Sequence, residues 1–356
     1  MTRARALALD LRDRFAGAGA RVVEPPVLLS ADVLLDLYGE DIRGRAYVTA
    51  DALRGEQMLR PDFTVPVVQM HMADGQAPAR YTYAGEVFRR QEEDPERDNE
   101  YLQVGYEVFD AANPAAADAE VFATLSEAVA HLPLRAATGD IGILMAAVDG
   151  LQTSDGRKAA LRRHIWRPRR FRALLDRFGG RSAPPPSRVA LLNGEAPEPG
   201  PLTGLRSQAE IDARVATLRD DAAQPPISGA EMEGLDALLN VRETLPFALQ
   251  HLQDLAVDLP SISDAVHRLQ ARTDALADRG VDVSALEFEA SYGRTSMEYY
   301  DGFVFGFYAA ARPDLPPVVS GGRYDALTRR LGGADAVPAV GGVIRPGLVA
   351  ALEGTT

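Results

Sequence analysis

The sequence predicts an α+β protein: an antiparallel sheet, flanked by helices, into which a helical segment is inserted. Three observations lead to this fold class. Segments rich in aromatic and β-branched residues lie near both ends of the chain and are typical of strands. Residues 142–280, between them, have mostly helical patterns. With 356 residues and 46% hydrophobic content, the chain can bury a full core.

The first part of the chain is predicted to be one helix followed by strands. Residues 3–17 place apolar side chains among arginines and aspartates, which favours an amphipathic helix ending near Gly17 or Gly19. Pro25 and Pro26 then require extended backbone in "RVVEPPVLLS". Strands are expected in "RAYVTA", "EQMLRPD", "ARYTYAGEVFRRQ" and "EYLQVGYEVFD". The last two flank the acidic loop "QEEDPERDN" and are predicted to form an antiparallel hairpin.

Beyond the hairpin, the chain is predicted to be mostly helical, with one strand before the helical stretch and further strands near its end. The segment "AAADAEVFATLSEAVAHL" predicts a helix, and "LRAATGDIGIL" predicts a strand and turn. Helical patterns interrupted by Pro- and Gly-rich stretches follow, and strand character returns in "ALEFEAS", "YYDGFVFGFYAA" and "PPVVSGGRYDAL". We therefore expect a core formed by residues 1–154 and 281–356, with a helical insertion subdomain at residues 155–280.

Composition narrows the class of function. The chain has no cysteine, and its five histidines are scattered, so disulfides, thiolate chemistry and a metal site are not expected. Its one lysine, Lys158, lies outside any phosphate-binding loop motif. A net charge of −13 disfavours nucleic acid as a partner. No apolar run approaches the roughly 18 residues of a membrane span, and no signal-peptide core is visible, so we expect a cytoplasmic protein with no membrane partner.

Six segments, taken in order, resemble a known protein family. They are "MLRPDFTVPV", "RYTYAGEVFRRQ", "QVGYEVFD", "MEYYDGFVFGFY", "GGRYDAL" and "PAVGG". Together they resemble the core of class II aminoacyl-tRNA synthetases and, within that class, the histidyl-tRNA synthetase group. The resemblance covers residues 1–150 and 285–352. It implies an antiparallel sheet of six or seven strands with flanking helices.

Two pairs of polar residues are candidates for binding a ligand. Gln103 and Glu107 are four apart in a predicted strand, so both side chains point to one face. Asp62 and Thr64 are two apart in a strand-like segment and could receive an ammonium group. The resemblance assigns Gln103 to a ligand's amine and Glu107 to its imidazole ring. The residues alone also allow Glu107 a structural salt bridge and Asp62 the role of a solvated loop acid.

The other candidates come from the matched motifs. Arg89 matches an arginine that holds the carboxylate and phosphate in the synthetases, and a guanidinium group suits either anion. Tyr299, Tyr300 and Tyr324 match aromatic residues that line the amino-acid pocket, although tyrosines in a sheet core are also ordinary packing residues. The resemblance thus implies a histidine-like pocket, with no catalytic residue and no cofactor.

Departures from the synthetase motifs affect the nucleotide site. The family reads approximately R-G-L-D-Y-Y where this chain has "TSMEYY", so Thr295 stands in place of an arginine that stabilises charge during adenylate formation. In the final motif, Leu348 and Gly347 stand in place of an arginine and a glutamate. Arg294 and Arg345 are nearby substitutes whose direction the sequence leaves open. The chain ends at Thr356, so no anticodon-binding domain is expected.

A synthetase-like core without nucleotide and tRNA machinery resembles the regulatory subunits of ATP phosphoribosyltransferase. The resemblance implies a catalytically silent dimer that joins the short-form catalytic subunit in a hetero-octamer, activates it and relays feedback inhibition by histidine. Histidine could bind in the synthetase-like pocket or at the joint between subunits. Two alternatives are an adenylating ligase that acts on a carrier and an interaction module with a vestigial pocket.

Overall fold

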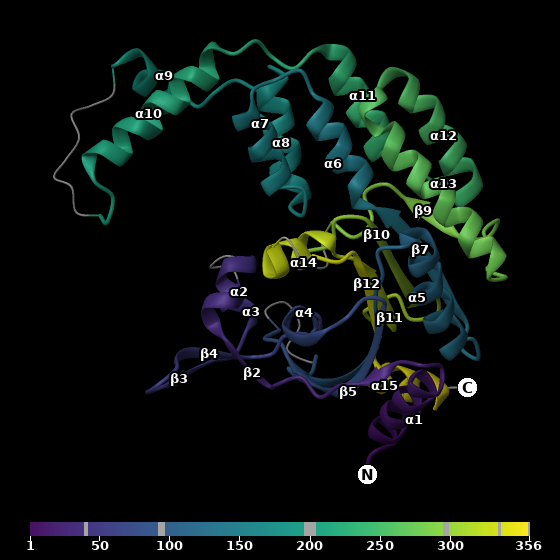
Figure 1. Ribbon diagram of the computed structural model, residues 1–356. Helices are drawn as coiled ribbons and strands as arrows, with labels where there is room; N and C mark the ends of the chain where they lie inside the picture. Colours follow the sequence, from purple (N-terminus) through teal and green to yellow (C-terminus); the bar gives the residue numbers. More distant parts are fainter. Residues whose placement is uncertain (39–41, 92–96, 196–203, 295–298, 334–335, 355–356) are drawn as a thin grey trace.

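The computed structural model describes residues 1–38, 42–91, 97–195, 204–294, 299–333 and 336–354. Within these ranges the core is a nine-stranded sheet with the order β1-β5-β6-β12-β11-β10-β7-β9-β8, beside a small sheet with the order β2-β4-β3 (Figure 1). The strands are β1 (Arg21–Val22), β2 (Leu28–Ser30), β3 (Val48–Asp51), β4 (Gly55–Leu59), β5 (Ala79–Phe88), β6 (Glu100–Phe109), β7 (Leu134–Asp140), β8 (Arg242–Thr244), β9 (Glu287–Glu289), β10 (Phe303–Ala309), β11 (Val319–Arg323) and β12 (Ala339–Ile344).

The α+β class and the β5–β6 hairpin are confirmed, but the predicted sheet of six or seven antiparallel strands is wrong. The central strands, β5-β6-β12-β11-β10-β7, do pair antiparallel. However, β1 joins β5 in parallel at one edge, and β9 joins β7 in parallel at the other, where β8 follows. The described sheet is therefore mixed and has nine strands. The added strands are only two or three residues long, too short to show an alternating pattern.

The helices begin at capping signals that the sequence carries. Thr2 and Asn113 accept N-cap hydrogen bonds for α1 and α5, and Pro346 occupies the first turn of α15. The helices are α1 (Arg3–Gly17), α2 (Ala31–Tyr38), α3 (Ile42–Arg45), α4 (Thr64–Asp74), α5 (Pro114–Ala128), α6 (Ile141–Gly150), α7 (Asp155–Arg163), α8 (Pro168–Phe178), α9 (Pro186–Asn193), α10 (Gln208–Ala223), α11 (Gly229–Leu239), α12 (Leu245–Asp258), α13 (Ser263–Asp278), α14 (Asp325–Gly332) and α15 (Pro346–Glu353).

The two faces of the large sheet have different neighbours. On one face α1 contacts β5 and β6, α5 contacts β12, and α15 packs beside α1, which brings the two ends of the chain close together (Figure 1). Phe122 of α5 contacts the rings of Phe303, Phe305 and Phe307 on alternate positions of β10. The helices α4 and α14 pack against each other on the opposite face, which carries the candidate site.

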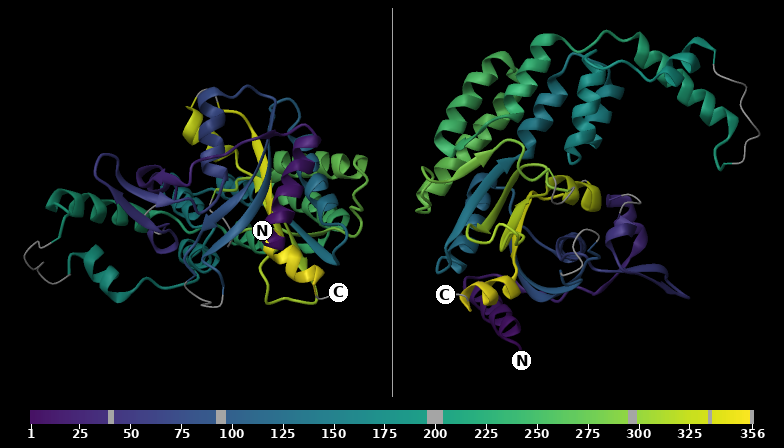
Figure 2. Two further views of the ribbon diagram at one scale, coloured as in Figure 1. Left: turned by 90° about the horizontal axis from the view of Figure 1, so that it is seen from below. Right: turned by 180° about the vertical axis from the view of Figure 1, so that it is seen from behind.

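The helices from α6 to α13 arch over one end of the core, and α9 and α10 lie farthest from it (Figure 2). The strand β8 lies within this helical stretch and pairs with β9 of the core sheet, so the two regions share one sheet. The division at residues 155–280 stays a prediction. Within the described ranges, no helix has both the length and the apolar character of a membrane span.

Candidate functional site

The candidate site is centred on a carboxylate buried at the middle of the β5–β6 hairpin. The hairpin pairs Tyr83 with Gly105, and Gln103 and Glu107 lie two residues away on either side of that glycine. Because side chains alternate along a strand, Gln103, Glu107 and Tyr83 share one face, as the spacing of 103 and 107 predicts. Tyr106, at the next position, instead contacts α1 and α5 on the other face.

Glu107 is held by hydroxyl groups. Its side chain is 1% exposed, and its two oxygens accept hydrogen bonds from Tyr83 Oη at 2.7 Å and Tyr324 Oη at 2.6 Å. Burial raises the pKa of Glu107 to about 7, although both hydrogen bonds act to lower it, and the nearby charge of Asp62 raises it further. Across the described ranges both Glu107 oxygens accept from tyrosine hydroxyls and no arginine, lysine or histidine pairs with them, which argues against the salt-bridge alternative.

Two glycines create the space for this arrangement. A Cβ atom at Gly341 of β12 would lie 1.4 Å from Glu107 Oε2, and one at Gly105 would lie 2.1 Å from the ring of Tyr83. Both distances are far shorter than a van der Waals contact. Gly341, the first glycine of "PAVGG", is therefore needed for the Glu107 carboxylate to occupy its position.

The residues Asp62 and Thr64 reach the site by a different route from the one predicted. They do not lie in a strand, because β4 ends at Leu59 and Thr64 begins α4. The carboxylate of Asp62 accepts from the backbone N–H of Val65, 3.4 Å away, so the acid lies at the helix start instead of on a strand face. A polar residue just before a helix favours this geometry, so the strand-like interpretation of this segment was wrong.

The tyrosines and Gln103 complete the cluster. Tyr299 donates a 3.2 Å hydrogen bond to Thr64 Oγ1, and its ring contacts those of Tyr300 and Tyr324. Gln103 is 1% exposed, and its Oε1 has no hydrogen-bond partner within the described part of the chain. A buried acceptor without a donor is costly, so this oxygen is a position where a ligand donor would be favoured.

We refer to the eight predicted residues plus Tyr83 as the Glu107 cluster. Tyr83 was missed, although its place on the same face as Glu107 follows from the hairpin register and strand alternation. The members are Asp62, Thr64, Tyr83, Arg89, Gln103, Glu107, Tyr299, Tyr300 and Tyr324.

Arg89, within the cluster, and Arg345, near it, point in different directions. Arg89 is partly buried, its Nε donates to the carbonyl of Pro61 at 2.7 Å, and its charge is close enough to act on Tyr300. Arg345 packs its guanidinium against the ring of Tyr101, 5.9 Å from the centroid, and donates to the carbonyl of Pro317. Burial, and to a smaller extent the charge of Arg89, lower the pKa of Arg345.

Arg294 turns away from the Glu107 cluster and donates to the carbonyl of Ile165, before α8. Thr295, which was aligned with an arginine of the synthetases, lies outside the described residues. No group of three or more acidic or histidine side chains able to hold a metal ion occurs in the described part of the chain.

The fold and the motifs define a protein of the histidyl-tRNA synthetase type. The family model for histidyl-tRNA synthetase matches residues 1–196 and 205–346. The fold is similar to that of an ATP phosphoribosyltransferase regulatory subunit/histidyl-tRNA synthetase from Bacillus halodurans, with a TM-score of 0.69 and 20% identity, over 98% of this chain and 79% of the other. It is also similar to histidyl-tRNA synthetase from Nostoc sp. PCC 7120, with a TM-score of 0.64 and 17% identity, over 99% and 73% of the two chains.

More similar sequences distinguish the family within this class. The ATP phosphoribosyltransferase regulatory subunit of Brucella ovis is 31% identical over 353 residues, which span 93% of this chain and 93% of the relative. That of Brucella abortus is 31% identical over 93% of this chain and 92% of the relative. The chain belongs to the family of ATP phosphoribosyltransferase regulatory subunits.

Proposed function

We propose that this chain activates a short-form ATP phosphoribosyltransferase catalytic subunit and conveys feedback inhibition by histidine, without catalysing a reaction itself. The reaction joins ATP to phosphoribosyl pyrophosphate in the first step of histidine biosynthesis. Membership of the regulatory-subunit family supports this proposal. We further propose that the chain forms a dimer through its core, assembles into a hetero-octamer in the cytoplasm, and has no nucleic-acid partner.

The observation that carries the histidine proposal is the environment of Glu107. A carboxylate with a pKa of about 7, buried among hydroxyl groups, gains most from a ligand that offers a polarised N–H group. An imidazole ring has two nitrogens and a pKa near this range, so it can donate a hydrogen bond or share a proton with the carboxylate. Among amino-acid side chains, histidine has this combination in a flat ring that suits a site lined by aromatic rings.

The rest of the Glu107 cluster suits the backbone of an amino acid. The Oε1 atom of Gln103 and the carboxylate of Asp62 are acceptors for an ammonium group, and Thr64 adds a hydroxyl. Arg89 supplies a cation for the carboxylate. The cluster thus offers complementary groups for a zwitterion and for an imidazole ring.

The proposed absence of catalysis rests on the cations that adenylation needs. Leu348 and Gly347 occupy the matched positions of the final motif, and a neutral side chain cannot stabilise charge that develops on a phosphate. Arg294 is directed toward Ile165 and Arg345 toward Pro317, and neither contact places the guanidinium at the Glu107 cluster. Loss of one such group typically costs about 10²- to 10³-fold in rate.

Feedback requires that histidine bind the inhibited assembly more tightly than the active one. Equal affinity for both states would shift nothing, and each tenfold preference contributes about 1.4 kcal/mol toward the inhibited state. The test is to reconstitute phosphoribosyltransferase activity from the short catalytic subunit with and without this chain, and to titrate histidine. A catalytic subunit that is fully active alone and unaffected by this chain would contradict the proposal.

Calorimetry and an exchange assay separate the two rival functions. Binding of histidine, alone or with the catalytic subunit present, is expected, and its absence from both mixtures would favour a vestigial pocket. ATP-dependent pyrophosphate exchange is expected to be absent, and clear exchange would favour an adenylating ligase.

A further inference from the structure

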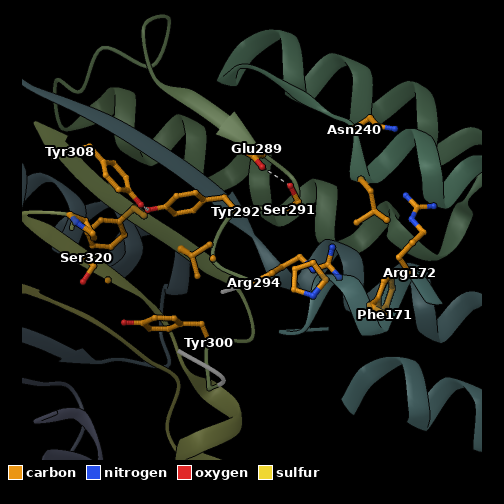
Figure 3. Close-up of a pocket in the computed structure, with 17 residues that line it drawn as sticks. Phe171, Arg172, Asn240, Glu289, Ser291, Tyr292, Arg294, Tyr300, Tyr308 and Ser320 are labelled. Carbon is orange, nitrogen blue, oxygen red and sulfur yellow. Dashed lines mark hydrogen bonds between the residues drawn. The ribbon is translucent and has the colours of Figure 1, made fainter. Parts of the chain in front are cut away.

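A cavity of about 480 Å³ lies between the large sheet and the helical stretch (Figure 3). Its walls come from β10 and β11, from the loop after β9, and from the helices α8 and α11. Tyr308 and Ser320 lie at its sheet side, whereas Phe171 and Arg172 of α8 lie at the helical side (Figure 3). The volume is in the range that small-molecule sites occupy.

Arg294 is the buried charge of this cavity. It is 5% exposed, its Nε donates to the carbonyl of Ile165 at 2.7 Å, and its guanidinium lies 4.7 Å from the ring centroid of Phe171. The side chain extends from the loop after β9 toward Phe171 and Arg172 (Figure 3). Its Nη2 has no hydrogen-bond partner among the described residues. A buried guanidinium N–H without an acceptor is unfavourable, so an acceptor that enters the cavity would be stabilised there.

The charges around Arg294 also favour an anion. Burial, and then the charge of Arg172, lower the pKa of Arg294 to about 10. Among the described residues, the lining has two arginines and one acid, Glu289, which accepts a hydrogen bond from Ser291. Arg172 is paired with Asp236, which lies outside the lining. An anion beside Arg294 would therefore relieve both the desolvation of its guanidinium and the repulsion between the two arginines.

The rest of the lining is suited to a small polar molecule. The hydroxyl groups of Tyr292 and Tyr308 hydrogen-bond to each other at 2.8 Å, and Ser320 and Asn240 add further polar side chains. The ring of Tyr300 lines the cavity and also belongs to the Glu107 cluster. The cavity and the cluster are thus neighbouring sets of side chains that have Tyr300 in common.

We propose that this cavity is a second ligand site, in which Arg294 binds the oxyanion group, phosphate or carboxylate, of a small metabolite. The site is distinct from the proposed histidine pocket, because its charged residues, Arg294, Arg172 and Glu289, are not members of the Glu107 cluster. If no anion binds at Arg294, the proposal of a histidine pocket still stands. If histidine does not bind at the Glu107 cluster, the proposal of an anion site still stands.

The test uses the full chain and three probes: inorganic phosphate, pyrophosphate and acetate. Calorimetry and thermal unfolding are expected to show binding at millimolar concentration and a stabilisation that grows with probe concentration. Tighter binding of the phosphates would assign the group as phosphoryl, and tighter binding of acetate would assign it as carboxylate. No binding of any probe would overturn the proposal.

Variants locate the bound anion. Arg294→Met keeps an unbranched apolar side chain beside Phe171 and removes the guanidinium donors, so the probe that binds should bind about tenfold more weakly or worse. Arg172→Gln and Arg181→Met form a matched pair, because both arginines bind Asp236 but only Arg172 lines the cavity. Roughly threefold weaker binding is expected for Arg172→Gln alone. If Arg294→Met fails to fold, the comparison of Arg172→Gln with Arg181→Met is the test. Equal affinities of these two variants for the probe would overturn the assignment of the anion to this cavity.

Discussion

Glu107→Gln is the most informative change, because the structure predicts how its effect on stability depends on pH. The folded protein holds the Glu107 proton with a pKa of about 7, against 4.5 for an ordinary glutamate. The contribution of Glu107 to the free energy of unfolding of the wild type is therefore largest below pH 4.5. It falls as the pH rises toward 7 and stays constant at higher pH. The difference in pKa corresponds to about 2 to 3 kcal/mol between pH 5 and pH 8. Glutamine does not ionise and carries no such loss.

Denaturant unfolding of the two proteins at pH 5, 6, 7 and 8 measures this effect. Glutamine has its own cost at every pH, since one tyrosine hydroxyl must turn from donor to acceptor beside the amide. That cost cancels when the difference between variant and wild type is compared across pH values. From pH 5 to pH 8, the free energy of unfolding of the variant should rise by about 2 to 3 kcal/mol relative to that of the wild type. A difference that does not change with pH would refute the burial argument for Glu107.

Three further predictions concern the cluster and the core. Tyr324→Phe removes a hydrogen bond that lowers the pKa of Glu107, so the pH at which stability stops falling should move upward in the same unfolding series; an unchanged midpoint would contradict this. Gly341→Ala should displace the carboxylate and abolish calorimetric binding of histidine, while Gly347→Ala, where an added Cβ meets nothing within 4 Å, should bind as wild type does. Arg272→Met leaves buried Asp140 without its cation and buried Asp118 with Arg323 alone, so it should lower the free energy of unfolding by about 3 to 5 kcal/mol, whereas a loss below about 1 kcal/mol would show that water already reaches Asp140.

The long elements of the fold could be predicted from the sequence, and the short ones could not. The ten-residue strands of the hairpin show clear alternation, and α1 and α15 have the glycine and proline signals that end and begin helices. The strands β1, β8 and β9 exist because neighbouring strands offer unpaired backbone groups, not because their two or three residues have a pattern. The parallel strand pairs at the sheet edges could therefore be found only from the structure.

Strand periodicity and the matched motifs made part of the candidate site predictable. The shared face of Gln103 and Glu107 follows from their even spacing, and the same rule could have found Tyr83. Asp62 was placed wrongly because its role depends on α4, a helix that begins where a strand-like segment was predicted. The cavity brings Arg294 against α8, which lies about 120 positions earlier in the sequence. Contacts between such distant segments leave no local pattern in the sequence.

Histidine inhibition of the reconstituted complex, compared between wild type and Glu107→Gln, tests the central claim most directly. Both forms of the chain should activate the short catalytic subunit to a similar degree, because Glu107 is buried and cannot contact a partner surface. Histidine should inhibit the complex that contains wild type and leave the Glu107→Gln complex active. Equal inhibition of both complexes would contradict the account and place the histidine site elsewhere in the assembly.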